Sequence, residues 1–291
     1  MSREEAQKLQ IEGRYSELLR AAVAEQVAAR DAGRAQDELD WTIWAAKACR
    51  FIGRTYEGMA HAVHAAQLAA RSPSPDAAVA VLYVQALLFK GARQPAAALG
   101  LLDQAIALLP EQAEESSRAA FELERAELCL DAGRANEARI ALARAAARVQ
   151  WIESTRLLAW TMYLRSHFEN PVVAAGLLTG AQQIAAGMKC PELEWHIQWK
   201  LAVCMSRIGK RDAEEDCARR ALGLLRGMAS TVSPDDAAAF WRQGARGEFV
   251  EYFSARFPSS AAPRPAAAGV ALDPAVLPGF VLAALGGKLT A

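Results

Sequence analysis

The sequence has no long uninterrupted hydrophobic run and no excess of charge of either sign. Lysine plus arginine and aspartate plus glutamate each number 33, so the chain lacks the positive charge that binding to a phosphate backbone requires. The opening residues, MSREEAQKLQ, are charged and lack the apolar centre of a secretory signal. The apolar stretch at 272–289 is short and interrupted by Pro274 and Pro278, so it cannot span a bilayer. We therefore expect a soluble, cytoplasmic protein with no membrane span and no nucleic-acid partner.

Paired cysteines and strand patterns are also absent. The five cysteines are widely spaced and never form a C-x-x-C pair, which predicts reduced thiols that pack as small hydrophobic side chains. Alternation of polar with apolar β-branched residues, which is typical of strands, does not occur, whereas alanine is abundant throughout. The sequence therefore predicts an all-α protein.

The clearest pattern that is present lies between residues 121 and 149, FELERAELCLDAGRANEARIALARAAARV. Two helical patterns meet at Gly133, which predicts a helical hairpin. The small residues Ala126 and Ala138 allow the two helices to approach closely, and Leu142 fills the remaining space. Because one apolar face of such a hairpin stays uncovered, the unit needs neighbours of the same kind.

The same pattern recurs along the chain with a period of about 40 residues, marked by glycines at 13, 53, 133 and 209. It predicts six hairpins within residues 1–230, enough to bury a continuous core by stacking. The fifth has no turn glycine and starts its second helix at Asn170 and Pro171 instead. The predicted hairpins cover residues 2–30, 35–71, 74–109, 121–149, 152–188 and 191–228. The expected architecture is a right-handed α-α superhelix.

The C-terminal part differs in composition. Residues 231–257 begin with a helix-start signal at Ser233 and contain several aromatic residues, which predicts a capping helix over the last hairpin, although Gly244 and Gly247 weaken its middle. A helix that binds a partner is the alternative. Residues 258–291 are predicted to be an alanine- and proline-rich linker and an apolar tail that folds back on the superhelix or docks on another chain.

Four turns carry the motifs GRYSELL, GRTYEG, GRANEARIALARA and GKRDAEEDCARRAL. Each has a glycine turn followed by small residues at helix-packing positions. In this respect the hairpins resemble tetratricopeptide repeats, particularly the degenerate arrays of bacterial regulatory proteins. The resemblance covers about residues 1–230 and implies binding of a protein or peptide. The Asn and Lys pattern with which some members grip a chain terminus is not reproduced, so we do not predict capture of a C-terminal peptide.

The resemblance also implies that the first helix of each hairpin lines the concave surface. Aromatic and basic residues gather there in the C-terminal half, which suits an acidic and apolar segment of a partner. The competing interpretation is that each tryptophan fills space between adjacent hairpins. The predicted partner-binding residues are Trp44, Lys47, Arg50, Tyr83, Glu127, Arg156, Trp160, Tyr163, His167, His196, Trp199, Lys200 and Arg207, with Lys90 and Glu124 on the same face.

No catalytic constellation is apparent in the sequence. His61 and His64 have a spacing that suits a metal, but no third ligand is evident from the sequence, and the acidic run ELERAE reads as a solvated helix face. We expect no enzyme activity, cofactor or metal. The main hypothesis is an interaction scaffold or adaptor that binds a protein or peptide in its groove. The alternatives are a regulator that senses a ligand or peptide by changing curvature, and a subunit that self-assembles through its end hairpins or tail.

Overall fold

The structure is a computed structural model that describes residues 1–258, and within them it contains fourteen α-helices, two short 3-10 helices and no strand. The predicted all-α, solenoid-like fold is therefore confirmed. The predicted linker and apolar tail, from residue 259 onward, lie outside the described residues.

Six helical hairpins follow one another along the chain, at the places where the sequence pattern predicts them. Their turns are short, so the two helices of each hairpin are antiparallel neighbours. The paired helices are α1 (Arg3–Ile11) with α2 (Tyr15–Asp31), α3 (Ala35–Ile52) with α4 (Thr55–Arg71), α5 (Pro75–Gly91) with α6 (Pro95–Ala107), α7 (Glu115–Asp131) with α8 (Ala135–Val149), α9 (Thr155–Arg165) with α10 (Pro171–Gly187), and α11 (Pro191–Ile208) with α12 (Arg211–Ala229).

Side-chain caps fix the starts of α5 and α10, which lack a preceding glycine turn. The Ser74 hydroxyl accepts a hydrogen bond from the amide of Ala77 at 3.1 Å, and a proline follows at the first helical position. The side chain of Asn170 accepts bonds from the amides of Val172 and Val173, both at 3.1 Å. Each cap satisfies amides that have no partner within the helix, and both predicted helix starts are confirmed.

Small residues bring the two helices of each hairpin together. In the fourth hairpin Ala126 and Ala138 are fully buried, as the sequence predicts, and so is Cys129. All five cysteines are free thiols and four of them are buried, in agreement with their predicted role as small hydrophobic side chains. Alanine at these positions allows closely spaced helix axes, and neighbouring hairpins supply the leucines that complete the core.

The C-terminal segment differs from the single capping helix that the sequence predicts. A 3-10 turn (Pro234–Asp236) leads into α13 (Ala237–Arg242), and α14 (Ala245–Arg256) follows after a sharp break. The break occurs at Gly244, whose φ of 51° lies in the region that favours glycine. The segment therefore turns a corner instead of continuing along the last hairpin.

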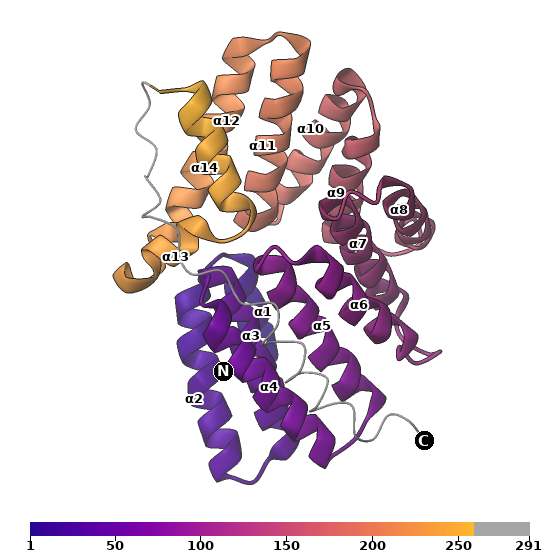
Figure 1. Ribbon diagram of the computed structural model, residues 1–291, viewed down its shortest axis with the longest axis vertical. Coiled ribbons are helices and arrows are strands. Elements are labelled where there is room, and N and C mark those ends of the chain that lie inside the picture. Colours follow the sequence, from indigo (N-terminus) through magenta and orange to yellow (C-terminus); the bar gives the residue numbers. More distant parts are fainter. Residues whose placement is uncertain (259–291) are drawn as a thin grey trace.

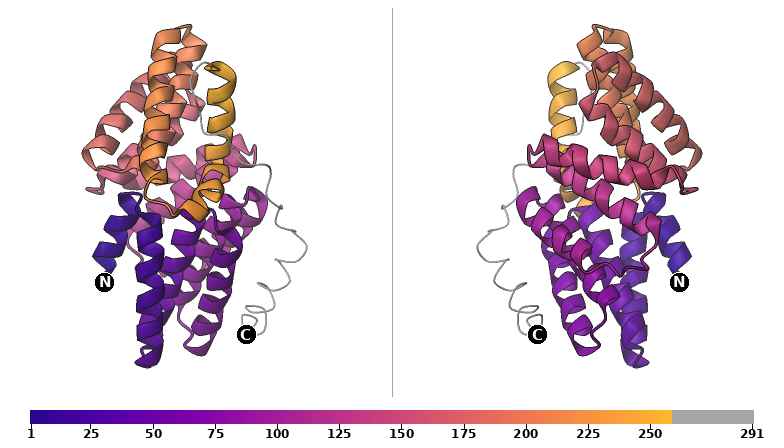
Figure 2. Two further views of the ribbon diagram at one scale, coloured as in Figure 1. Left: turned by 90° about the vertical axis from the view of Figure 1, so that its left-hand side faces the viewer. Right: turned by 90° about the vertical axis from the view of Figure 1, so that its right-hand side faces the viewer.

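This corner brings the end of the described chain back to its beginning. In Figure 1 the helices run from α1 through α6 in the lower half, past α7 to α9 on the right, and through α10 to α12 above, before α13 returns to the first hairpins. The side views in Figure 2 show the same return. One hydrophobic cluster contains buried residues of the first, second and last hairpins together with α13 and α14. The superhelix thus closes on itself.

A buried arginine lies at the centre of this closure. The side chain of Arg246, 1 % exposed, donates a hydrogen bond to the carbonyl of Phe51 at 2.7 Å and forms an ion pair with Glu192 at 2.9 Å. The Tyr15 hydroxyl donates to the same carboxylate at 2.9 Å, and the guanidinium lies 3.9 Å from the ring centroid of Phe240. These contacts join α14 to α2, α3 and α11.

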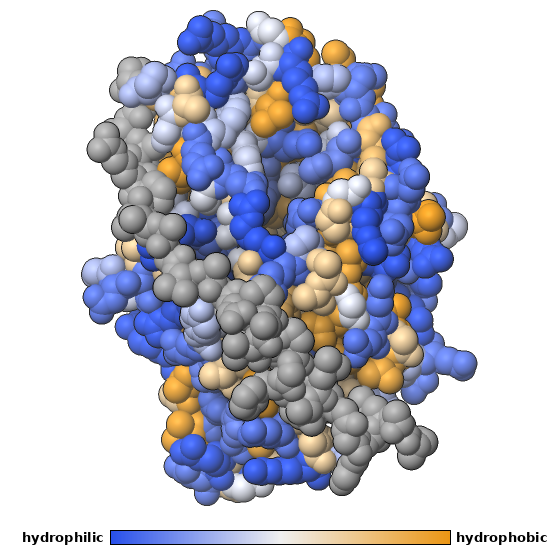
Figure 3. Space-filling view, in the orientation of Figure 1, coloured by the Kyte–Doolittle hydropathy of each residue, from blue (hydrophilic) through white to orange (hydrophobic). Residues whose placement is uncertain are grey.

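The face of the molecule seen in Figure 3 is mainly hydrophilic, with hydrophobic residues scattered among charged ones. This agrees with a core that lies between the helices of adjacent hairpins. Within residues 1–258, no helix is both long enough and apolar enough to cross a membrane.

The closure predicts unequal effects of the same substitution in two turns. Gly53 and Gly133 both have positive φ, 93° and 73°, but a Cβ at Gly53 would lie 2.5 Å from the carbonyl oxygen of Ala239 in α13, whereas one at Gly133 would meet no atom within 4 Å. Gly133→Ala should cost about 1–2 kcal/mol of unfolding free energy through backbone strain. Gly53→Ala should cost about 1–3 kcal/mol more, because it also overpacks the contact with α13.

Urea denaturation of both variants measures this difference. Equal losses of stability in the two variants would show that the turn at Gly53 does not contact α13 in solution.

Candidate functional site

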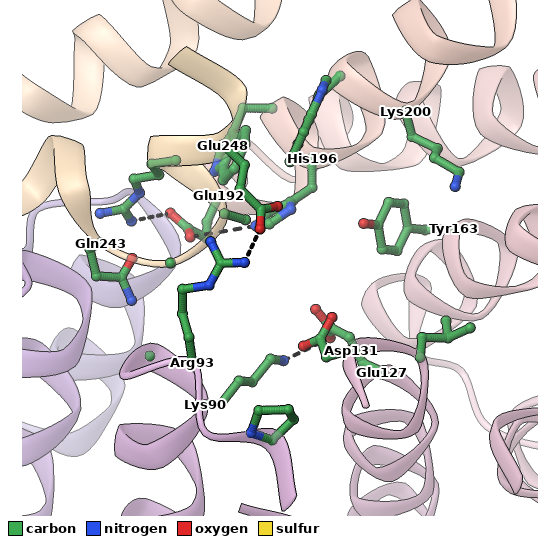
Figure 4. Close-up of a pocket in the computed structure, with 18 of the residues that line it drawn as sticks. Lys90, Arg93, Glu127, Asp131, Tyr163, Glu192, His196, Lys200, Gln243 and Glu248 are labelled. Carbon is green, nitrogen blue, oxygen red and sulfur yellow. Dashed lines mark hydrogen bonds and ion pairs between the residues drawn. The ribbon is translucent and has the colours of Figure 1, made fainter. Parts of the chain in front are cut away.

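Closure of the superhelix turns its concave face into a cavity of about 560 Å³. Its walls come from helices that are far apart in sequence, as Figure 4 shows: Lys90 from α5, Glu127 from α7, Tyr163 from α9 and Glu248 from α14. A smaller cavity of about 120 Å³ shares several of these residues. The two cavities together form the candidate site, which we call the central cavity.

The structure brings most of the predicted partner-binding residues to the central cavity. The larger part is lined by Arg50, Glu127, Tyr163, His167, His196, Trp199 and Lys200, and the smaller part adds Arg156 and Trp160. Lys47 and Tyr83 line a separate cavity of about 460 Å³. Trp44 and Arg207 line none of these three cavities: the Lys47 ammonium lies 4.7 Å from the ring centroid of Trp44, and Arg207 is exposed.

The predicted excess of basic residues is offset by carboxylates. Lys90 forms ion pairs with Glu124 at 2.5 Å and Glu127 at 3.0 Å, and the larger part of the cavity also contains Asp131, Glu192 and Glu248. Burial disfavours the ammonium form of Lys90, but the two glutamates outweigh this effect and raise its pKa. Counting along first helices found Arg50, Arg156 and Lys200 but not Arg93 or Arg246. Three cations of the cavity, Lys90, Arg93 and Arg246, have a carboxylate partner.

Arg50 and Lys200 are the cations of the larger cavity that keep unneutralised charge. Neither has a carboxylate within ion-pair distance in the part of the chain that the structure describes. The Lys200 ammonium instead donates to Nδ1 of His167 at 3.2 Å, and the Arg50 guanidinium lies 4.6 Å from the ring centroid of Phe51. An anionic group in the cavity would therefore meet two free positive charges.

The two histidines of the cavity are neutral at pH 7. Burial lowers the pKa of both His167 and His196 to about 4, and the Lys200 ammonium adds to the effect at His167. Because Nδ1 of His167 accepts from Lys200, its proton is assigned to Nε2. That Nε2 is buried and has no hydrogen-bond partner among residues 1–258.

Hydrogen-bond donors without acceptors concentrate around the central cavity. Nine buried side-chain polar atoms in the described residues lack a partner, and five of them belong to residues that line the larger cavity. All five carry hydrogen: they are Nε of Arg50, Nε2 of His167, Nε1 of Trp195, Nε1 of Trp199 and Nε of Arg246. Buried donors are nearly always paired, so the five unpaired donors are an unusual feature of the side chains around the cavity.

Aromatic rings form one wall of the cavity. Trp195 and Trp199 are stacked with 6.0 Å between ring centroids, and Trp199 meets Phe249 of α14 at 5.8 Å. Trp195 is 1 % exposed, so it fills space between helices, which is the competing interpretation of the tryptophans. Trp199 is half-buried; it packs on α14 and also lines the cavity. Figure 4 shows the hydroxyl of Tyr163 directed toward the middle of the space.

Sequence reasoning missed Arg93, Glu192, Arg246 and Glu248, which all line the cavity. Arg246 and Glu248 belong to the segment predicted as a cap, and Arg93 lies in a turn, where it forms an ion pair with Glu248. Arg93 has a φ of 61° at a position where most other hairpin turns have glycine. A non-glycine residue with this conformation is uncommon. In the sequence, the signal was an arginine at a turn position where four other hairpins have glycine.

The neutral histidines predict a loss of stability in mild acid. Their folded-state pKa of about 4 lies below the ordinary 6.5, so the unfolded chain binds more protons between these values, and stability falls as the pH drops through this window. Between pH 7 and pH 5 the loss should be about 1–2 kcal/mol per histidine. Urea unfolding at both pH values should show a smaller loss in His167→Gln and His196→Gln. NMR titration of either imidazole near its ordinary pKa would contradict the burial.

Comparison with known proteins supports the fold and goes no further. No family model matches the sequence, and no curated protein matches it. Among the solved structures that match, one described as the crystal structure of BtubC (BKLC) from P. vanneervenii is 15 % identical with a TM-score of 0.53, and the match covers 89 % of this chain and 98 % of that one. At this identity the likeness shows a shared all-α fold and carries no function with it.

Proposed function

We propose that the protein is a non-enzymatic adaptor that binds an acidic segment of a partner protein in the central cavity. The observation that carries this proposal is the pair of cations lining the cavity, Arg50 and Lys200, that have no carboxylate within ion-pair distance among residues 1–258. A carboxylate bound in the cavity supplies the missing negative charge.

Charge and apolar surface support the same kind of ligand. Arg50 and Lys200 offer free positive charge from α3 and α11, and Trp199 and Tyr163 offer aromatic surface between them. Charge-assisted bonds to a carboxylate are stronger than neutral ones, and aromatic side chains contribute apolar contact at low entropic cost. An Asp or Glu flanked by apolar residues meets both requirements.

A second candidate function is a regulator that senses a small anion or a short peptide. Its support is the size of the cavity: about 560 Å³ falls within the range of roughly 300–1,000 Å³ that is typical of small-molecule sites. Gln243 and Gly244, at the corner between α13 and α14, form part of the lining. A ligand there contacts both ends of the superhelix and can change how they meet.

Self-assembly through the end hairpins has less support. Residues of α1, α2, α11 and α12 share one hydrophobic cluster within a single chain, so this closure already covers surfaces that the end hairpins would otherwise offer to another copy. The apolar tail lies outside the described residues.

Binding of defined acidic probes tests the proposal. We would measure fluorescence anisotropy with short labelled peptides that place Asp or Glu between Leu and Phe residues, and calorimetry with free succinate and glutarate. The double variant Arg50→Gln/Lys200→Gln should weaken binding about tenfold or more, because each charged contact contributes about 1.5–3 kcal/mol.

Arg207→Gln is the matched control, because Arg207 lies on the same helix as Lys200 but is exposed and outside the cavity. Binding of peptides but not of the free acids supports the adaptor, and the reverse supports the sensor. No binding to the intact chain, or equal affinity in the double variant, would contradict an acceptor-binding cavity.

A further inference from the structure

We propose that Cys49, Glu57 and His61 form a binding site for a divalent transition-metal ion, with Zn²⁺ the best fit. The sulfur of Cys49, a carboxylate oxygen of Glu57 and a ring nitrogen of His61 all lie within 4.8 Å of one another. Thiolate, imidazole and carboxylate are the three ligand types that Zn²⁺ takes in proteins. The cluster lies outside the central cavity and is independent of the proposed function.

The hairpin formed by α3 and α4 brings the three side chains together. Glu57 and His61 are four residues apart on α4 and so share one face of that helix. Cys49 comes from the last turn of α3. The two helices are very close here, since a Cβ at Gly58 would lie 3.0 Å from Cβ of Cys49.

The cluster extends from the core to the surface, which gives an ion a way in. Cys49 is buried, His61 is half-buried and Glu57 is exposed. His61 forms no hydrogen bond within residues 1–258, so its ring is free to ligate, whereas His64 lies 3.2 Å from the carboxylate of Glu38. The two histidines of the sequence pattern therefore do not share a site. His61 lies with Cys49 and Glu57, and His64 lies with Glu38.

Ligation requires only small adjustments. Tetrahedral Zn²⁺ with bonds of about 2.0–2.3 Å places its ligand atoms roughly 3.5 Å apart, so the side chains must close by about 1 Å. The Cys49 thiol releases its proton to solvent when its sulfur binds the ion. Three protein ligands leave a fourth position for water or an incoming group.

Glu57 also contacts Arg54, at 2.9 Å, but this arginine does not depend on it. Arg54 binds both carboxylate oxygens of Asp236, at 2.6 and 2.9 Å. If Glu57 turns to a metal ion, Arg54 keeps a charged partner. The contact with Asp236 belongs to the C-terminal closure, so the cluster lies beside the junction between the first and last parts of the superhelix.

The fourth hairpin contains a natural comparison. Cys129, Arg134 and Glu137 occupy the same places relative to Gly133 as Cys49, Arg54 and Glu57 do relative to Gly53. The position that corresponds to His61 is Ala141, which is fully buried. The cysteine and the glutamate are therefore shared with another hairpin, and the histidine is what makes the second hairpin capable of binding a metal.

Metal titration of the full chain tests the proposal. After treatment with a chelator, Zn²⁺ should bind at one ion per chain by calorimetry, with a dissociation constant of micromolar or tighter. Co²⁺ should produce the near-ultraviolet absorption of a sulfur-to-cobalt transition. Cys49→Ser and His61→Gln should each weaken Zn²⁺ binding at least about tenfold, and Cys49→Ser should also abolish the cobalt–sulfur band.

Cys129→Ser and His64→Gln are the matched controls and should bind as the natural chain does. Circular dichroism checks that each variant folds; if Cys49→Ser does not, His61→Gln and the exposed Glu57→Gln decide the question. Absence of stoichiometric Zn²⁺ binding, or unchanged affinity in the folded variants, would overturn the proposal.

Discussion

The ion pair between the buried Arg246 and the partly exposed Glu192 is the interaction on which the closed form of this superhelix depends. A charge that is removed from water is tolerated only when it is paired and its remaining hydrogens are satisfied. Arg246 meets most of this requirement with groups from distant parts of the chain: the carboxylate of α11 and the carbonyl of Phe51 at the end of α3. Packing of Phe240 and Tyr15 around it excludes water.

Closure has a direct consequence for the concave face. An open superhelix presents a trough, but here α13 and α14 complete the wall and leave a cavity. Most of the charged groups that line it form ion pairs with one another, and the donors that remain have nothing to bind within the described residues. The same contacts that stabilise the fold therefore also shape the proposed binding site.

Local patterns in the sequence predicted the six hairpins. Glycine turns, the caps at Ser74 and Asn170, and alanine at packing positions each act within one hairpin, so the pattern placed all six hairpins correctly. Counting along first helices also located Tyr163 and Trp199. The closure could not be predicted this way, because it depends on the accumulated curvature of six hairpins, and Arg246 stands in a segment whose charges resemble those of a surface helix. The bond between Tyr15 and Glu192 joins residues that no local pattern relates.

A double-mutant cycle on Arg246 and Glu192 tests the central claim most directly. Urea unfolding would be measured for Arg246→Met, Glu192→Gln, the double variant and the natural chain. Glu192→Gln leaves the buried Arg246 without its charged partner and should cost about 3–5 kcal/mol. Arg246→Met should cost less, because Glu192 is 24 % exposed and keeps the hydrogen bond from Tyr15. The double variant should lose at least about 1.5 kcal/mol less than the sum of the two. Additive losses would show that the two residues do not interact and that the superhelix is not closed by this pair.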